Sequence, residues 1–210
     1  CGTGSQIFYL TKYGYNMTGS DFSPELLKIA RKKAKEQNLA IKFIDGDMRF
    51  VRIGYFEAVI TMFNAIGHLS KADFAKAIRN IGQNLVKNGI YIFDIFNLKA
   101  LTEKAVANLK MDEKFIVNGD QIRQIQYSKL DKEKAILTSY ENYQIKDSSG
   151  QIKELNNAFS LQIYRLQELK EILAENGFKT LNICDIYGRE FIEDESLNIL
   201  IMAQKTHDQF

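Results

Sequence analysis

The feature that most constrains the fold is an alternation of short apolar strands with amphipathic helices over the first hundred residues. The strongest helix signal starts at Ser23, a good N-cap, followed by Pro24, which the first helical turn tolerates. Apolar residues then recur at helical spacing as far as Ala34. Such an alternation predicts a mostly parallel sheet covered by helices on both faces. The pattern predicts helices at 5–13, 23–38 and 73–86, and strands at 15–20, 41–44, 56–63 and 90–96. The strand at 56–63 is apolar enough to predict burial on both faces.

The pattern changes between residues 115 and 164, where apolar and polar residues alternate with a period of two. This period is typical of antiparallel strands, with turns expected at 130–133 and 147–150. A helix at 166–176 and strands at 178–186 and 197–203 complete the chain. We therefore expect an α/β domain made of residues 1–97 and 166–210. An antiparallel β insertion, residues 98–165, is expected to pack over its sheet as a substrate cover or a dimer surface, and its tyrosines suit either role.

Composition excludes several classes of protein. The chain has 210 residues, with 28 basic and 26 acidic side chains and a net charge of +2. This balance gives no electrostatic reason to bind nucleic acid or an anionic membrane. No apolar run approaches the roughly 18 residues of a membrane span. The two cysteines, Cys1 and Cys184, make no disulfide framework, so a reduced cytoplasmic setting is expected. No cluster of metal-ligating residues stands out.

The first candidate site is the glycine turn Cys1-Gly2-Thr3-Gly4, which opens a predicted helix. Glycines allow the backbone to approach a ligand closely, and the helix N-terminus offers free N–H donors. Asp21 comes one helix and one strand later, where an acidic side chain can accept hydrogen bonds from both hydroxyls of a ribose. The alternative is an ordinary turn with a surface aspartate.

A second candidate is Asp45-Gly46-Asp47-Met48, directly after a predicted strand. In open parallel sheets ligands bind beyond the carboxyl ends of the strands. The Asp47 carboxylate can accept from an adenine amino group there, and Met48 can lie against the ring. Taken alone, this segment equally fits an Asp-Gly turn in which Asp47 caps the residues after it.

The third candidate is the segment 61–68, which leaves a predicted strand with mixed polar and aromatic residues and ends at His68. A histidine at this strand end can transfer protons near neutral pH. A solvent-facing or structural histidine is the alternative. The other histidine, His207, lies in the charged tail, and no role is expected for it.

Together these residues resemble the class I S-adenosylmethionine-dependent methyltransferases. The glycine turn matches the end of the family's first motif, and Gly46-Asp47 matches its third. Residues 46–49 and 62–68 are also similar to small-molecule N-methyltransferases, including those that act on nucleotide-linked amino sugars. The second motif, G-x-D-x-S-x-x-M/L-L-x-x-A, is matched by Gly19, Asp21, Ser23, Leu27 and Ala30.

The resemblance implies a Rossmann-like three-layer sandwich with a mostly parallel, seven-stranded sheet and an antiparallel last strand. In the family an acidic residue on the first strand precedes the glycine turn, and it contacts the methionine amino group of the cofactor. The printed chain begins inside that motif. We therefore expect the protein to extend upstream by roughly 30 to 50 residues, enough for a helix and the first strand.

The resemblance also implies roles for individual residues toward S-adenosylmethionine. Cys1, Gly2 and Gly4 would line its methionine and ribose part, and Asp21 would hold the ribose hydroxyls. The adenine would lie against Phe22 and Met48, with its amino group facing Asp47. The residues expected at the methionine end and toward the substrate are Phe63, Asn64, His68 and, at the pocket mouth, Tyr187, for which an exposed loop residue is the alternative.

The function that the resemblance implies is transfer of a methyl group to a small molecule by in-line displacement, with an amine nitrogen favoured as acceptor and His68 assisting its deprotonation. No Asn-Pro-Pro-Tyr segment comes after the strand at 56–63, which argues against nucleic-acid substrates. A monomer or a homodimer is expected. Two alternatives stay open: a nicotinamide-dependent oxidoreductase that uses the same glycine turn, and a non-catalytic module that binds the cofactor.

Overall fold

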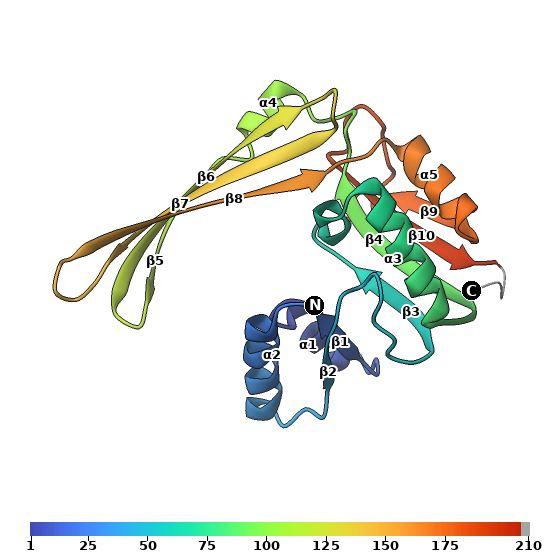
Figure 1. The fold of residues 1–210 in the computed structure, drawn as a ribbon, viewed down its shortest axis with the longest axis horizontal. Coiled ribbons are helices and arrows are strands. Elements are labelled where there is room, and N and C mark those ends of the chain that lie inside the picture. The colour runs from blue at the N-terminus through green and yellow to red at the C-terminus, as the bar shows by residue number, and fades with distance from the viewer. Residues whose placement is uncertain (207–210) are drawn as a thin grey trace.

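The computed structural model describes residues 1–206, which form an α/β body and a long antiparallel sheet that projects from it (Figure 1). The body contains two sheets with helices packed against them. Along the chain its elements are α1 (Ser5–Lys12), β1 (Thr18–Asp21), α2 (Pro24–Glu36), β2 (Lys42–Asp45), β3 (Phe56–Thr61), the 3₁₀ helix η1 (Ala65–His68), α3 (Lys71–Gln83), β4 (Leu85–Phe96), α5 (Leu166–Glu175), β9 (Phe178–Cys184) and β10 (Asn198–Lys205).

The sheets of the body are mostly parallel. β1 pairs in parallel with β2, and a second sheet has the order β3-β4-β10-β9. β3 and β4 are parallel, whereas β10 runs antiparallel to both β4 and β9. The expected mixed α/β fold with an antiparallel last strand is therefore confirmed. The seven-stranded sheet expected from the resemblance is represented, within residues 1–206, by these two sheets of two and four strands.

The helix predicted from the Ser23-Pro24 signal forms as α2. The Ser23 side chain accepts a hydrogen bond from the backbone N–H of Leu26 at 3.4 Å, which satisfies one of the free donors of the first turn. The apolar face of α2 packs with α1 and β2 in a small core of Ile7, Phe8, Leu27, Ala30, Ala34 and Phe43. This core holds the start of the chain against the β1–β2 sheet.

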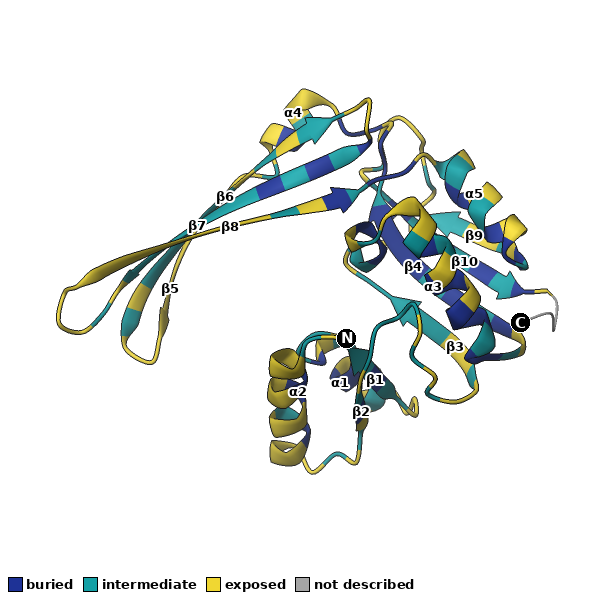
Figure 2. Cartoon of the chain, viewed as in Figure 1, coloured by how far each residue is buried: buried dark blue, intermediate teal, exposed yellow. Residues whose placement is uncertain are grey.

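The main core lies between the four-stranded sheet and helices α3 and α5 (Figure 2). Its largest fully buried side chains include the aromatic residues Phe74, Tyr91, Phe93 and Tyr164. Phe74 from α3 meets Phe93 edge-on, with ring centroids 5.6 Å apart. Such aromatic packing contributes about 0.5–1.5 kcal/mol beyond the area that it buries. Ile66 of η1, in the loop that leaves β3, is part of this core.

Two predictions about the body are corrected by the structure. The strand predicted to be buried on both faces, β3, is only half-buried or exposed along its length. Within residues 1–206 it pairs with β4 alone. The helix predicted over 73–86 starts two residues earlier, capped by Ser70, and ends at Gln83. Leu85 and Val86 belong to β4 instead, because Leu85 pairs with Phe56 of β3.

The insertion forms a four-stranded antiparallel sheet in sequential order. The expectation that it packs over the sheet of the body is wrong, because only its base reaches the body while the rest projects outward (Figure 1). At the base, a short helix that the sequence did not predict packs with Leu137, Leu161 and Ile163 in a second core. The elements are α4 (Glu103–Ala107), β5 (Met111–Val117), β6 (Asp120–Asp131), β7 (Ile136–Lys146) and β8 (Ile152–Gln162). Within residues 1–206, no helix has both the length and the apolar character that a membrane crossing needs.

Candidate active site

The glycine turn and Asp21 lie together at the carboxyl end of β1. The backbone N–H of Gly2 donates to Asp21 Oδ2 at 2.7 Å. Asp21 Oδ1 accepts from the N–H of Ser23 at 3.0 Å. Gly4 ends the turn with a φ of +85°, and a Cβ there would lie 2.8 Å from the ring of Phe8. Only glycine fits this position, because it avoids both the strain and the overlap.

These contacts keep Asp21 ionised. Burial raises the pKa of its carboxyl group, whereas the hydrogen bonds from the N–H groups of Gly2 and Ser23 lower this pKa and favour the charged form. A carboxylate of this kind is an acceptor at every physiological pH. The space above Gly2 is open, since a Cβ built there has no atom within 4 Å. The glycine turn can therefore contact a nucleoside cofactor through its backbone, and Asp21 can accept hydrogen bonds from the ribose hydroxyls.

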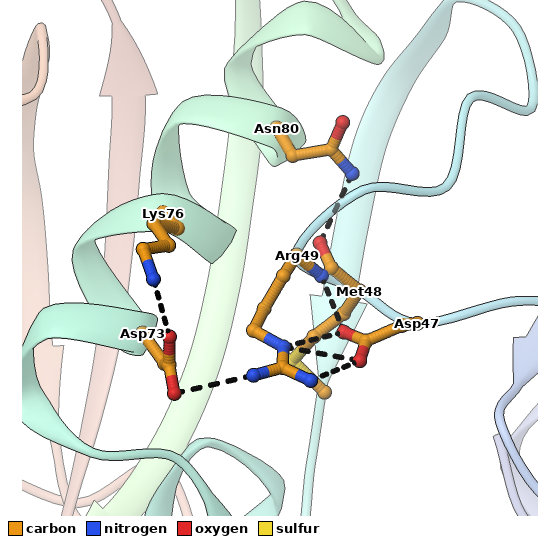
Figure 3. A network of polar contacts seen from close by, with 6 residues as sticks. All are labelled: Asp47, Met48, Arg49, Asp73, Lys76 and Asn80. Carbon is orange, nitrogen blue, oxygen red and sulfur yellow. Dashed lines mark hydrogen bonds and ion pairs between the residues drawn. The ribbon is translucent and has the colours of Figure 1, made fainter.

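Asp47 lies one strand away from this turn. Asp21 and Asp45 are register partners at the ends of β1 and β2, and the N–H of Gly46 donates to the Asp21 carbonyl at 3.0 Å. The Asp47 carboxylate is paired with Arg49, whose Nη2 lies 2.6 Å from Oδ2 (Figure 3). This hydrogen bond holds the pKa of Asp47 below its usual value. The residues predicted to contact adenine thus lie together at the edge formed by the carboxyl ends of β1 and β2.

The two side chains predicted to lie against adenine are also near this edge. Phe22 comes directly after Asp21 and is 78% exposed, while Met48 comes directly after Asp47 and is half-buried. An exposed phenylalanine beside an ionised carboxylate suits stacking on a flat ring.

The predicted methionine end is a strained turn directly after β3. Phe63 and Asn64 both adopt left-handed backbone conformations, with φ of 62° and 57°. Their N–H groups donate to the two carboxylate oxygens of Asp94, at 2.5 Å and 3.3 Å. Asp94 is fully buried on β4, and burial raises the pKa of its carboxyl group. Consecutive left-handed residues cost about 1–3 kcal/mol each, so Asp94 compensates for strain at a candidate functional position.

Asp94 was missed as a site residue by the sequence reasoning. The signal was present, because Asp94 is the one charged residue in the apolar run Ile90–Phe96, near the end of a predicted strand. A buried charge in a strand needs partners, and at a strand end those partners belong to the adjoining loop. The side chain of Asn64 is also unusual, because its Oδ1 is buried and has no hydrogen-bond partner.

His68 lies at the end of η1, beside the base of the projecting sheet. Its ring centroid is 5.8 Å from that of Phe159 on β8. Partial burial lowers the pKa of His68 from its ordinary value of 6.5. The ring is therefore neutral at pH 7 and available as a proton acceptor.

An open pocket of about 450 Å³ joins the helix after the glycine turn to the end of β3. Phe63 is part of this pocket, and its side chain is 67% exposed. The remaining lining residues are Ser5, Gln6, Tyr9, Leu10, Ile60 and Met62. Asp21 and Asp47 lie outside the pocket, so it adjoins the predicted nucleoside edge and does not contain it.

One predicted residue is placed apart from the others. Tyr187 comes after β9, which β10 and β4 separate from β3, and its side chain is 79% exposed. It packs against Arg189, whose guanidinium carbon lies 4.9 Å from the ring centroid. Its substrate role stays a prediction. His207 lies outside the described residues. Within residues 1–206, no three His, Cys, Asp or Glu side chains are gathered as a metal site.

Comparisons with known proteins agree with this geometry. Residues 1–89 match the methyltransferase domain family. A candidate methyltransferase of Geobacillus sp. (strain WCH70), GWCH70_2453, is 23% identical over 98% of this chain and 82% of its own length. The dTDP-3-amino-3,4,6-trideoxy-alpha-D-glucopyranose N,N-dimethyltransferase of Streptomyces venezuelae is 30% identical over 96 residues, which are 45% of this chain and 39% of that enzyme.

A solved structure gives the same result for the fold. The S-adenosylmethionine-dependent methyltransferase from Clostridium acetobutylicum superposes with a TM-score of 0.82 at 18% identity, over 99% of this chain and 82% of that one. The comparisons give no support to the nicotinamide-dependent alternative. The chain therefore has the fold of an S-adenosylmethionine-dependent methyltransferase, and its residues 1–89 match the methyltransferase domain family.

Proposed function

We propose that the protein transfers a methyl group from S-adenosylmethionine to an amine nitrogen of a small molecule. The observation that carries this proposal is the joined arrangement of the Gly2 N–H, the ionised Asp21 carboxylate and, one strand away, Asp47. This arrangement provides acceptors for a ribose and for an amino-purine at the carboxyl ends of parallel strands. The bound cofactor supplies an electrophilic methyl group on a sulfonium.

The protein's part in such a reaction is to position the acceptor and to remove its proton. A displacement at carbon requires the nucleophile about 3 Å away and in line, so the turn at Phe63 and Asn64 must be rigid. Asp94 provides that rigidity through its two backbone hydrogen bonds. An amine reacts only when unprotonated, and the neutral His68 ring is the group proposed to accept its proton.

The base of the projecting sheet is proposed as the cover of the acceptor site. Phe159 of β8 contacts the His68 ring, and Leu161 and Gln162 lie against Gly67. Side chains from the insertion therefore stand next to the proposed proton acceptor, where they can exclude water. A dimer surface on this insertion stays a prediction that light scattering of the purified protein will check.

The acceptor class is proposed to be an amine, with amino sugars linked to a nucleotide as the first candidates. The support is the relative from Streptomyces venezuelae, whose name gives a dTDP-linked 3-amino sugar as substrate, together with the neutral histidine. The test is transfer of isotopically labelled methyl groups to a panel of dTDP-amino sugars, simple amines and hydroxyl compounds. Labelling of amines and not of the matched hydroxyl compounds is expected. Cofactor binding without labelling of any acceptor would favour a non-catalytic module instead.

The proton role of His68 has its own test in the pH dependence of kcat/KM. The wild-type enzyme is expected to lose activity on acidification with an apparent pKa below 6.5, whereas the His68→Asn variant lacks this limb. Phe159→Ala is the informative second variant, since exposing the ring raises the pKa of His68 and moves the limb to higher pH. Full activity and an unchanged profile in His68→Asn would remove the proton role and leave the class of enzyme intact.

A further inference from the structure

The loop between β2 and β3, residues 46–55, is fastened along one face of α3. Asn80 donates through Nδ2 to the carbonyls of Met48 and Val51, at 3.0 Å and 2.8 Å. One turn later, Asn84 donates to the Val51 carbonyl at 3.0 Å and accepts from the N–H of Ile53 at 2.8 Å. Both asparagines are buried. The backbone from Met48 to Ile53 is therefore fixed by buried amides of α3 and of its C-cap residue.

The same face of α3 also reaches the side chain of Asp47, through Arg49. Arg49 donates from Nε to both carboxylate oxygens of Asp47 at 3.0 Å and from Nη2 to Oδ2 at 2.6 Å. Its Nη1 donates to Asp73 Oδ2 at 3.2 Å. Figure 3 shows the guanidinium lying between the two carboxylates, one from the loop and one from the first turn of α3.

The bridge from Asp73 through Arg49 to Asp47 is partly buried, and its geometry requires a guanidinium. The side chains of Asp47, Arg49 and Asp73 are 34%, 31% and 25% exposed, so all three are partly shielded from water. A planar guanidinium that bonds to both oxygens fixes the plane of a carboxylate, which an ammonium group does not do. The backbone N–H of Arg49 also donates to Asp47 Oδ1, at 2.8 Å. Because Nε shares one hydrogen between the two oxygens, Arg49 uses three hydrogens on a carboxylate with about four lone-pair sites, and one site stays available as an acceptor.

We propose that Arg49 and Asp73 are positioning residues that orient the Asp47 carboxylate toward the 6-amino group of the cofactor's adenine, and so determine selectivity for a 6-aminopurine. This inference rests on the proposed function, which places adenine at Asp47. A 6-oxopurine presents a carbonyl oxygen to the same carboxylate, and two acceptors facing each other lose the hydrogen bond and repel. A site built around a hydrogen bond rejects an analogue that lacks the donor only while its own group stays in place.

The test compares two ligands that differ only at that position, S-adenosylhomocysteine and S-inosylhomocysteine. Calorimetry of the wild-type protein is expected to show a clear preference for the 6-amino ligand. In Arg49→Gln and Asp73→Asn the preference is expected to fall about tenfold, which corresponds to 1.4 kcal/mol. Asp73→Glu keeps a carboxylate for Arg49 and is expected to restore most of the preference. Arg49→Lys keeps the charge but not the fork and should restore little of it.

The matched control is Lys76→Gln. Lys76 Nζ lies 2.9 Å from Asp73 Oδ1, so Lys76 pairs with the carboxylate that also holds Arg49. Lys76 is not one of the residues that connect Asp73 to Asp47. Its ligand preference should stay within twofold of wild type. Thermal melts of every variant separate a loss of preference from a loss of folding.

Three outcomes would overturn the inference, and they differ from one another. Failure of wild-type protein to bind S-adenosylhomocysteine would refute the proposed function along with it. Binding with equal affinity for both ligands would show that Asp47 does not read the 6-amino group. The third outcome is that Arg49→Gln and Asp73→Asn keep the wild-type preference while their affinities for both ligands fall equally. The two residues would then have a structural role only.

Discussion

Two segments of the site each involve a carboxylate, and the two carboxylates differ in their surroundings. In the β2–β3 loop, Asp47 is partly exposed and paired with the cation of Arg49. In the turn after β3, Asp94 is fully buried and accepts only from uncharged backbone N–H groups among its described hydrogen bonds. Accordingly, the pKa of Asp47 lies below its usual value and that of Asp94 above it.

The difference shows that orientation and stability are separate contributions at this site. Removing an acceptor from buried donors leaves a desolvation cost that nothing repays. Removing one partner of a partly exposed ion pair costs little, because water takes its place. The turn after β3 should therefore depend on Asp94 for folding, whereas the β2–β3 loop should depend on Arg49 mainly for the direction of one side chain.

The largest effect is expected for Asp94→Ala. This change leaves the N–H groups of Phe63 and Asn64 without their acceptor in a strained turn, at a cost of about 2–4 kcal/mol in the free energy of unfolding. Urea denaturation measures it. Asp94→Asn keeps an acceptor for Phe63 and should lose less. Equal stability of Asp94→Ala and wild type would show that the turn holds its shape by other contacts.

A smaller effect is expected for Asn80→Ala, which removes the donor shared by the Met48 and Val51 carbonyls. The expected loss is about 1–2 kcal/mol in the free energy of unfolding, since the part-buried Met48 carbonyl loses its amide donor while the Val51 carbonyl keeps Asn84 as a donor. Lys76→Ala on the exposed side of the same helix is the control for helix propensity. If Asn80→Ala and Lys76→Ala lose the same stability, the amide of Asn80 does not stabilise the β2–β3 loop.

The next prediction concerns the pH dependence of the free energy of unfolding, to which the raised pKa of Asp94 contributes. The raised pKa of Asp94 means that the native state holds this proton to higher pH than the unfolded chain, in which it titrates near 3.8. Wild-type protein should therefore lose stability relative to Asp94→Asn as the pH rises from below 3.8 through the raised pKa. Denaturation curves of both proteins across this range check the sign. The opposite slope would mean that Asp94 is stabilised as an anion.

The smallest effect on folding is expected for Arg49→Gln, with a loss of stability smaller than that of Asn80→Ala, because a partly exposed ion pair contributes little. The loss should shrink further as salt screens the ion pairs with Asp47 and Asp73. Melting temperatures measured with and without added salt test this. A large, salt-independent loss would show that Arg49 is a folding residue, and it would weaken the selectivity argument as well.

Much of the body could be predicted because its signals are local. Ser23 and Pro24 mark the start of α2, and Gly177 lies just past the end of α5. The motif spacing also placed Asp21 and Asp47 correctly at neighbouring strand ends. The hairpin between β5 and β6 carries a local signal too, since Asn118-Gly119 takes the left-handed conformations of a tight turn.

Other features depend on partners that are distant in the chain. The exposure of β3 depends on which strands pair with it, which apolar content does not show; within residues 1–206 only β4 does. The projection of the β5–β8 sheet likewise depends on where its base meets the body, and period-two patterning is the same for a covering sheet and a projecting one (Figure 2).

The sequence by itself determined the class of the fold, the glycine turn and the acidic residues at the strand ends, because spacing along the chain specifies these. Only the tertiary structure showed that Asp94 holds the turn at Phe63 and that Asp73 reaches Asp47 through Arg49. Both arrangements join residues 24 to 31 positions apart, and their energies depend on burial and on charge geometry, which exist only once the strands and α3 have packed.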